Sequence, residues 1–247
     1  MFRQLVLSRP IATIATVIVC AIGIALGFWQ VGRMEQKLAL AAEVAKKESS
    51  APLYANAKSW TLEEALHHRM IAKGTYLADK TIWLENRPHP MGRDPQTGIT
   101  VGFYVMTPLL LEHSKKVLWV NRGWVPRDGM DREKLPELMT SQGLIEVEGV
   151  VFEHPARVMS VGNQELDAEK RKIQQNLDLK LQESYLGVEH LPFILREVSA
   201  SKDGLSRDWA PLATGAEKHQ GYAFQWFALA TLAVIFWFLS GVLRKKL

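Results

Sequence analysis

The run IATIATVIVCAIGIALGFW, residues 11–29, contains no charged residue. A helix rises about 1.5 Å per residue, so this run is long enough to cross the roughly 30 Å hydrocarbon core of a bilayer. A second uncharged run covers residues 222–243. Because backbone polar groups cannot stay unpaired in lipid, we predict that both runs are membrane-spanning helices rather than strands.

The first run could instead be the apolar part of a cleaved signal peptide. Such a stretch is usually about 7 to 15 residues long, and this one is longer. A lipoprotein cleavage site is disfavoured, because Cys20 follows Val-Ile-Val at 17–19 rather than small residues. We therefore expect an uncleaved membrane anchor.

Two crossings place both chain ends on the same side of the membrane. Basic residues next to a crossing favour the cytoplasmic side. Both ends carry such residues: Arg3, Arg9, Arg244, Lys245 and Lys246. Basic residues also follow the first crossing, at positions 33, 37, 46 and 47. Long loops are translocated largely regardless of charge, so we expect cytoplasmic termini and an extracytoplasmic central domain.

The composition of the whole chain hides the two crossings, because its mean hydropathy is -0.05 and 23% of its residues are charged. The net charge of +4 can be assigned largely to the membrane-flanking tails, so it indicates little about nucleic acid. A single cysteine, Cys20, excludes an internal disulfide and paired-thiol metal or redox chemistry. The central domain must therefore be stabilised by its hydrophobic core.

The central part of the chain is predicted to be a mainly antiparallel α+β domain. Before it, residues 31–47 are rich in helix formers and should continue the first membrane helix into water, up to turn signals at 49–52. Six stretches combine β-branched and aromatic residues with partial alternation and are predicted strands: 70–76, 81–86, 100–111, 116–124, 144–151 and 192–198. One helix is predicted from about residue 165 to 185, where five apolar residues keep helical spacing: Leu166, Ile173, Leu177, Leu181 and Tyr185.

These elements divide the chain into six predicted parts. They are a cytoplasmic tail (1–10), the first transmembrane helix (11–30), a helical extension and linker (31–58), the α+β domain (59–217), the second transmembrane helix with an interfacial start (218–243) and a second tail (244–247). The expected fold class is a membrane protein in which two transmembrane α-helices flank an extracytoplasmic domain.

No catalytic residue is predicted. The sequence has no G-x-S-x-G, H-E-x-x-H, phosphate-binding glycine loop or dinucleotide fingerprint, and no cluster of metal ligands at matched spacing. His67, His68 and His89 are expected to be solvated loop or strand-edge residues. A membrane-tethered enzyme with an unrecognised site is the alternative, and loss of function from a change in the domain alone would support it.

The informative residues lie where the two crossings meet the central domain. Two sets follow i, i+3, i+7 spacing, which places each set on one helix face. They are Gln30, Arg33 and Lys37 on the first helix, and His219, Tyr222 and Trp226 on the second. If the crossings pack side by side, the two sets lie at the same membrane depth, face each other and form a cofactor pocket.

Each of these residues also has a structural explanation. Aromatic side chains gather in a belt at any membrane interface, and four residues here fit that belt: Trp29, Tyr222, Trp226 and Phe227. Arg33 and Lys37 can snorkel toward water and lipid phosphate. His219 can be a hydrated interfacial histidine.

Four ordered segments carry a resemblance to a known family. They are LGFWQVGRMEQK (26–37), FYVMTPL (103–109), VNRGWVP (120–126) and EKHQGYAFQWFALA (217–230). Together they resemble the surfeit locus protein 1 family of cytochrome c oxidase assembly factors, and the likeness spans the whole chain. The charged segment 163–185 replaces the Asn/Pro-rich, Trp-containing segment of mitochondrial members, which indicates a bacterial subtype.

The resemblance implies a non-enzymatic factor of the bacterial inner membrane with a periplasmic domain. Such a factor helps to insert haem a into the catalytic subunit of a haem-copper oxidase. Haem A synthase and membrane lipid are further expected partners, and nucleic acid is not expected. The second hypothesis is a scaffold of the same family that binds oxidase subunits and never holds haem.

The resemblance further implies that His219 is an axial ligand of the haem iron, which accepts a neutral imidazole. Arg33 or Lys37 would pair with the haem propionates, and their charge would favour the neutral imidazole. The remaining expected cofactor-binding residues are Tyr222 and Trp226, which would pack against the porphyrin, together with Gln30 and Trp29.

Within NRGWVP, Arg122 and Trp124 are candidate contacts with the oxidase subunit. The structural alternative is the end of a strand that turns at Gly123, with Pro126 fixing the exit of the chain. We favour this alternative over direct contact with haem.

Overall fold

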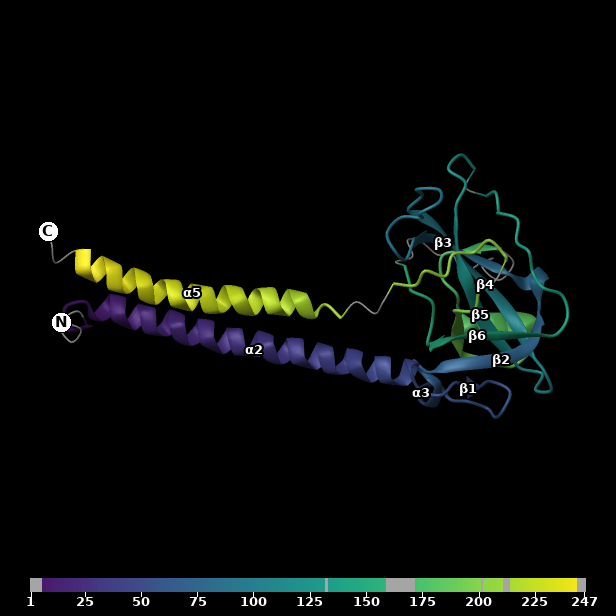
Figure 1. The fold of residues 1–247 in the computed structure, drawn as a ribbon, viewed down its shortest axis with the longest axis horizontal. Helices are drawn as coiled ribbons and strands as arrows, with labels where there is room; N and C mark the ends of the chain where they lie inside the picture. Colours follow the sequence, from purple (N-terminus) through teal and green to yellow (C-terminus); the bar gives the residue numbers. More distant parts are fainter. Residues whose placement is uncertain (1–5, 132, 159–171, 201, 211–213, 244–247) are drawn as a thin grey trace. The chain divides into compact units, whose positions relative to one another are not determined.

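The computed structural model describes residues 6–131, 133–158, 172–200, 202–210 and 214–243 (Figure 1). The chain divides into two compact units, which we describe in turn. A helical unit comprises residues 1–43 and 212–247, and a domain comprises residues 44–211.

The long helices described in the helical unit are α2 (Pro10–Glu48), whose residues 44–48 belong to the domain, and α5 (Ala216–Leu243). Both are long and apolar enough to cross a membrane. Large apolar side chains on both helices are exposed, among them Ile11 at 84% and Phe236 at 74%. Such outward apolar surfaces suit helices that are surrounded by lipid. The helix α2 continues beyond its apolar run to Glu48, where the turn signals predict its end.

The domain is built mainly from strands. The strands are β1 (Leu53–Tyr54), β2 (Arg69–Tyr76), β3 (Ile82–Pro88), β4 (Val101–Leu111), β5 (Val117–Pro126), β6 (Ile145–Phe152), β7 (Ile173–Gln174) and β8 (His190–Glu197). The short helices are α3 (Leu62–Ala65), the 3-10 helix η1 (Ala78–Lys80) and α4 (Leu179–Leu186). All six predicted strands are confirmed, as β2 to β6 and β8.

The strands form one sheet that closes into a small barrel. Its order is β1-β2-β6-β8-β5-β4-β3-β7, and β2 also pairs with β4. The long strand β4 makes this closure possible, because residues 101–106 pair with β3 and residues 109–111 pair with β2. Most pairings are antiparallel, as predicted, but β5 and β8 are parallel, as are the short pairings of β1 and β7. The barrel is therefore mixed.

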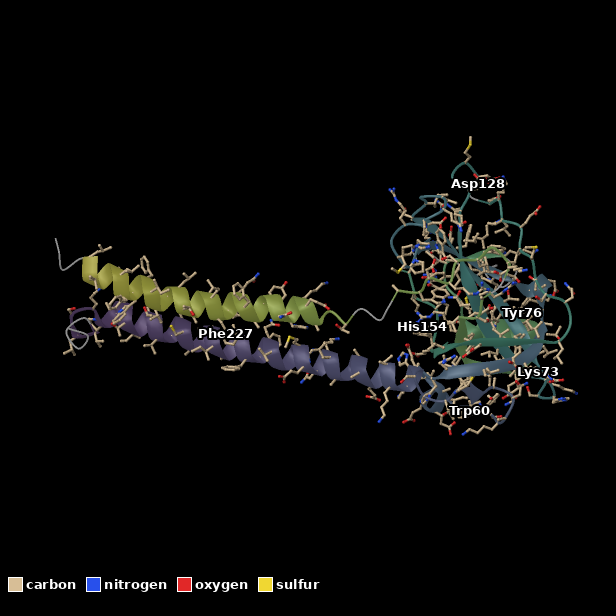
Figure 2. All side chains as sticks on the ribbon, in the orientation of Figure 1. Trp60, Lys73, Tyr76, Asp128, His154 and Phe227 are labelled. Atoms are coloured by element: carbon tan, nitrogen blue, oxygen red, sulfur yellow. The ribbon has the colours of Figure 1, made fainter. Side chains whose placement is uncertain are left out.

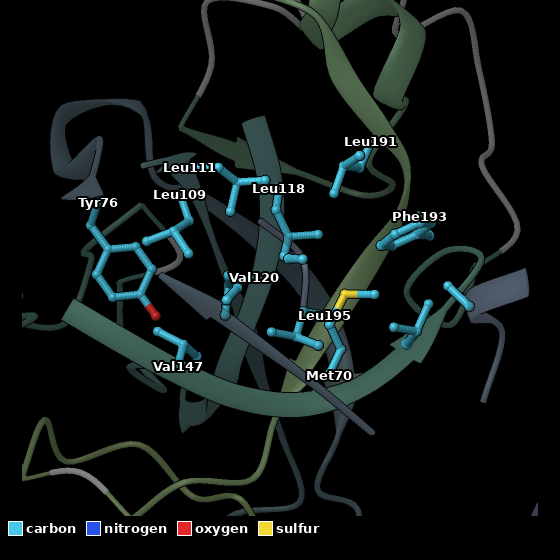
Figure 3. Close-up of a cluster of buried hydrophobic side chains, with 14 residues drawn as sticks. Met70, Tyr76, Leu109, Leu111, Leu118, Val120, Val147, Leu191, Phe193 and Leu195 are labelled. Carbon is cyan, nitrogen blue, oxygen red and sulfur yellow. The ribbon is translucent and has the colours of Figure 1, made fainter. Parts of the chain in front are cut away.

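Alternate residues of the strands fill the barrel (Figure 3). Leu118 and Val120 of β5 lie with Phe193 and Leu195 of β8 and Met70 of β2, all with no exposed surface. Full burial of one such side chain is worth roughly 1.5–3 kcal/mol relative to exposure. This apolar cluster stabilises the domain as the composition requires.

The helix predicted from about residue 165 to 185 is confirmed only over residues 179–185, and its described residues before 179 are not helical. Residues 173–174 form β7, which pairs in parallel with β3, and the helix α4 begins only after Asp178. The Asp178 side chain accepts hydrogen bonds from the backbone N–H groups of Lys180 and Leu181, and Gly187 ends the helix with a φ of 64°. These caps limit α4 to two turns. The predicted start at 165, with Leu166, lies outside the described residues.

The turn expected at Gly123 is a β-bulge. Strand β5 continues to Pro126, and its register against β4 shifts so that Asn121 and Gly123 oppose the neighbouring Met106 and Val105. Gly123 has a φ of 149°, and a Cβ there would lie 2.7 Å from Leu205. Glycine suits this position because other residues avoid that backbone conformation.

Candidate functional site

The helices α2 and α5 pack along a seam of small residues. Gly23 and Gly27 of α2 are buried there. A Cβ at Gly23 would lie 3.0 Å from that of Ala230, and one at Gly27 would lie 2.5 Å from the ring of Phe227, labelled on α5 in Figure 2. In lipid, small residues allow helix backbones to approach closely enough for packing to hold them together. The seam therefore depends on glycine at both positions.

Polar contacts fix the register of the seam near the chain ends. Trp237 Nε1 donates to Thr13 Oγ1 at 3.0 Å, and Arg9 Nη1 donates to Ser240 Oγ at 3.1 Å. The two helices are thus antiparallel and held in one register.

One polar contact joins the helices at the opposite end of the seam. His219 Nδ1 lies 2.7 Å from Gln30 Oε1, and Gln30 is only 9% exposed. An amide oxygen can only accept, so Nδ1 carries the proton and donates it to Gln30. In a neutral imidazole the other nitrogen, Nε2, then keeps its lone pair and can bind a metal.

The packing shows on which side of the seam each predicted residue lies. Phe28 and Phe227 meet edge to face with their ring centroids 5.4 Å apart, and they mark one side. Successive residues turn by about 100° around a helix. Arg33 and Lys37 therefore lie on the side of α2 away from Phe28, and the same reasoning places two residues of α5 away from Phe227. These are Tyr222 and Trp226.

Five of the residues on this second side form what we call the His219 face: Arg33, Lys37, His219, Tyr222 and Trp226. At about 1.5 Å per residue, Arg33 and Lys37 lie about 4.5 and 10.5 Å beyond Gln30, toward the end of α2. Because α5 runs the other way, Tyr222 and Trp226 lie at similar distances on the opposite side of His219. Along the helix axes, the His219 face therefore has the two cations at one end, the imidazole in the middle and the two aromatic rings at the other end.

The two predicted sets share a face, but they do not meet across the seam as a pocket would require. Of the six residues in the two sets, Gln30 and His219 alone are described as joined by a hydrogen bond across the seam. Arg33 is exposed and donates to Gln36 Oε1 at 3.0 Å, within its own helix. Trp29 is 56% exposed on α2 and lies one turn before Arg33, on the same side of the seam, with no hydrogen bond to His219 described. The aromatic belt accounts for Trp29.

The candidate partner contacts Arg122 and Trp124 both lie inside the domain. Arg122 is 3% exposed and pairs with Asp203 at 3.0 Å. It also donates to Thr140 Oγ1 at 2.7 Å. Trp124 is 1% exposed and donates from Nε1 to the backbone oxygen of Arg87 at 3.0 Å. Packing within the domain accounts for both side chains.

Arg122 belongs to a buried charge cluster that the sequence does not suggest. Arg207 pairs with Asp203 at 2.7 Å and with Glu197 at 3.3 Å, and Tyr76 lies beneath the Arg122 guanidinium. Burial raises the pKa of Glu197. Burial also opposes ionisation of Asp203, but hydrogen bonding and charge from Arg207 hold the pKa of Asp203 below its usual value. The cluster joins residues distant in sequence, and no motif marks it.

A second polar group, His89 with Ser206, resembles a catalytic base and nucleophile, but the hydrogen bond between them runs in the wrong direction for catalysis. Nδ1 of His89 accepts the backbone N–H of Met91 at 3.2 Å, so its proton is on Nε2 and points at Ser206 Oγ, 3.3 Å away. Ser206 in turn donates to Asp208 at 3.2 Å. This histidine cannot take a proton from the serine. Nor is His89 solvated as predicted, since it is 2% exposed.

The described titratable groups of the domain also form no metal site. Among the residues that the structure describes, no group of three or more His, Cys, Asp or Glu side chains could hold a metal ion.

Comparison with known proteins shows which family this chain resembles. A model described as the SURF1 family matches residues 17–231. A SURF1-like protein of Rickettsia bellii is 27% identical over 217 residues, which cover 85% of this chain and 82% of that protein. Surfeit locus protein 1 of Takifugu rubripes is 24% identical over 229 residues, which cover 90% and 93%. A SURF1-like protein of Drosophila melanogaster is 31% identical over 140 residues, which cover 53% of this chain and 46% of that protein.

Proposed function

The chain belongs to the SURF1 family, and on this premise we propose that it is an assembly factor for a haem-copper terminal oxidase that holds haem a on the His219 face. One observation carries the proposal. The hydrogen bond from His219 Nδ1 to Gln30 leaves Nε2 as the free nitrogen of a ring that is held in place. A haem iron takes an axial imidazole ligand in this form.

The other residues of the His219 face match the parts of a haem. Arg33 and Lys37 are exposed cations on one side of His219, where they would pair with the propionates. Tyr222, which is half-exposed, and Trp226 lie on the other side and would pack against the porphyrin. This face is open to its surroundings rather than enclosed. An open site suits a protein that passes haem on, because the haem can leave sideways toward a partner.

The proposal includes a place and partners for the protein. With both termini in the cytoplasm, the domain lies in the periplasm of a bacterial inner membrane protein and the His219 face lies at the outer leaflet. The partners are the catalytic subunit of the oxidase, which receives haem a, and haem A synthase, which supplies it. In this role the protein itself catalyses no reaction.

The test is the visible absorption spectrum of the detergent-purified protein, made in cells that synthesise haem A. We expect bound haem in the wild type and its loss in a folded His219→Ala variant. His113→Ala is the matched control, because His113 is an exposed histidine of the domain. Equal haem in His219→Ala and wild type would contradict the proposed ligand.

A second candidate function is a scaffold that binds oxidase subunits without haem. It is favoured by apolar side chains in solvent on the long loop between β5 and β6, where Met130 is fully exposed and Met139 is 67% exposed. Exposed methionines are common at protein-binding surfaces. Oxidase subunits that copurify with a haem-free wild type, and are lost when both methionines are changed to serine, would support this function.

A further inference from the structure

We propose that Gln30 is a positioning residue that fixes the tautomer of His219, and that its amide keeps the resulting iron ligand exchangeable. The second half of this inference, that the amide keeps the iron ligand exchangeable, rests on the proposed function. The first half concerns the protein without haem, because the hydrogen bond between Gln30 and His219 is present in the helix pair itself.

The position of Gln30 suits this task. Its side chain is 9% exposed and lies at the seam, with the buried Gly27 one turn earlier on α2. The packing between α2 and α5 therefore sets where Oε1 lies relative to the imidazole. Histidines that bind metals usually donate their second ring N–H to an oxygen acceptor, which fixes both tautomer and orientation. Gln30 is an acceptor of this kind, supplied by the other helix.

The choice of an amide rather than a carboxylate has a chemical consequence. A carboxylate acceptor pulls the Nδ1 proton more strongly and makes Nε2 a stronger donor to iron. It also places a charge in a buried interhelical position, which is costly. A neutral amide orients the imidazole without this added basicity. If haem binds here, Nε2 would be a ligand firm enough to hold the iron and weak enough to release it.

The first experiment uses the haem-free protein in lipid nanodiscs and reads the tautomer of His219 by 15N NMR. The signal of His219 is identified by its absence in His219→Ala. We expect the proton on Nδ1 in the wild type and a preference about fivefold smaller in Gln30→Leu, the ratio that corresponds to loss of roughly 1 kcal/mol. A proton on Nε2 in the wild type, or an unchanged preference in Gln30→Leu, would overturn the inference.

The matched control is Gln220→Leu. Gln220 is the residue after His219, so it lies at the same depth, and its exposed side chain turns toward the side of Phe227. The tautomer of His219 should be unchanged in this variant. A change as large as that in Gln30→Leu would show a general effect of amide loss and would count against the specific role of Gln30.

The second experiment measures the midpoint potential and the rate of haem transfer to an excess of apomyoglobin. We expect Gln30→Leu to bind haem about tenfold more weakly. Gln30→Glu should lower the potential and slow transfer, whereas Gln220→Glu should do neither. Equal potentials in Gln30→Glu and wild type would overturn the role of the amide.

The two proposals fail in different ways. A wild type that never binds haem, yet shows the Nδ1 tautomer and its loss in Gln30→Leu, contradicts haem binding and supports the positioning role. Haem on the wild type with an unaltered tautomer in Gln30→Leu supports haem binding and contradicts the positioning role.

Discussion

At the scale of single residues, the β-bulge of β5 explains why Arg122 lies in the interior. The bulge inserts one extra residue between Asn121 and Gly123, and the side chain of this residue points into the domain, where Asp203 meets it. Both side chains of the pair are 3% exposed. A guanidinium and a carboxylate that are buried together depend on each other, because either one alone would be a buried charge.

Arg122→Met is therefore expected to lower the free energy of unfolding of the domain by about 3 kcal/mol, since it leaves Asp203 with fewer partners. Urea denaturation of the full chain in detergent, followed by tryptophan fluorescence, measures the change. Arg93→Met is the control, because Arg93 is exposed on a loop. A loss for Arg122→Met no larger than that for Arg93→Met would show that the cluster contributes little to stability.

The sequence shows which polar residues lie at the candidate site but not how they meet. Spacing along each helix predicts that Gln30 shares a face with Arg33, and His219 with Tyr222. Whether Gln30 reaches His219 depends on the register of α2 against α5, which small residues and distant contacts such as that of Trp237 with Thr13 determine. Helical spacing within one segment carries no information on that register.

At the scale of elements, the seam between α2 and α5 makes a sharp prediction about glycine. Gly27→Ala places a Cβ 2.5 Å from the ring of Phe227, so the helices must separate or the ring must move. Overpacking of this kind costs typically about 1–3 kcal/mol. SDS-induced unfolding of the protein in mixed micelles should show a loss of that size.

Gly32→Ala is the matched control for the seam. Nothing lies within 4 Å of a Cβ at Gly32, which occupies the same helix five residues later. Alanine is the better helix former, so this change should be neutral or slightly stabilising. Restoration of stability in the double variant Gly27→Ala with Phe227→Leu would locate the clash, whereas equal behaviour of the two alanine variants would contradict it.

The helix α3 carries a pH-dependent cap. The Glu64 carboxylate accepts hydrogen bonds from Lys58 and from the backbone N–H of Thr61, and the Thr61 side chain accepts from the Glu64 N–H. The Lys58 hydrogen bond, followed by that from Thr61, lowers the pKa of Glu64 from 4.5 to about 2. A lowered pKa in the folded state means that the contribution is complete above about pH 4.5 and is lost as the pH falls through about 2.

The amide chemical shifts of residues 62–65 should accordingly lose their helical values between about pH 4.5 and about pH 2. Glu64→Gln should remove this pH dependence, and Glu63→Gln, a change in the same turn, should retain it. Lys58→Met should move the transition to higher pH. A transition that survives unchanged in Glu64→Gln would exclude the capping carboxylate as its origin.

The strands and the predicted helix differ in how well local sequence determined them. The six strands combine alternation with β-branched and aromatic residues, and in β5 and β8 this alternation fills the barrel. The predicted helix is too long because residues from two elements, Ile173 in β7 and Leu181 in α4, happened to keep helical spacing. Ile173 belongs to a strand only because β3 is available to pair with it, and that partner is remote in sequence.

At the scale of the whole molecule, the two apolar helices predict a topology that reporter fusions can measure. Alkaline phosphatase fused near Ser50 should be active, and a fluorescent protein fused at Leu247 should fluoresce, because basic residues near the chain ends favour cytoplasmic termini. Exchange of the two reporters is the control and should silence both. Active phosphatase at Leu247 would reverse the orientation and move the His219 face to the inner leaflet.

The seam has a final consequence for the stability of the domain. The domain, residues 44–211, has no free end, because the chain enters it from α2 and leaves it toward α5. As long as the helix pair holds, an unfolded domain is a closed loop whose ends stay tethered. Closing a loop of this length removes chain entropy worth on the order of 5 kcal/mol from the unfolded ensemble, as a disulfide would. The two apolar helices thus do for this domain, which has no cysteine, what disulfides do for other proteins.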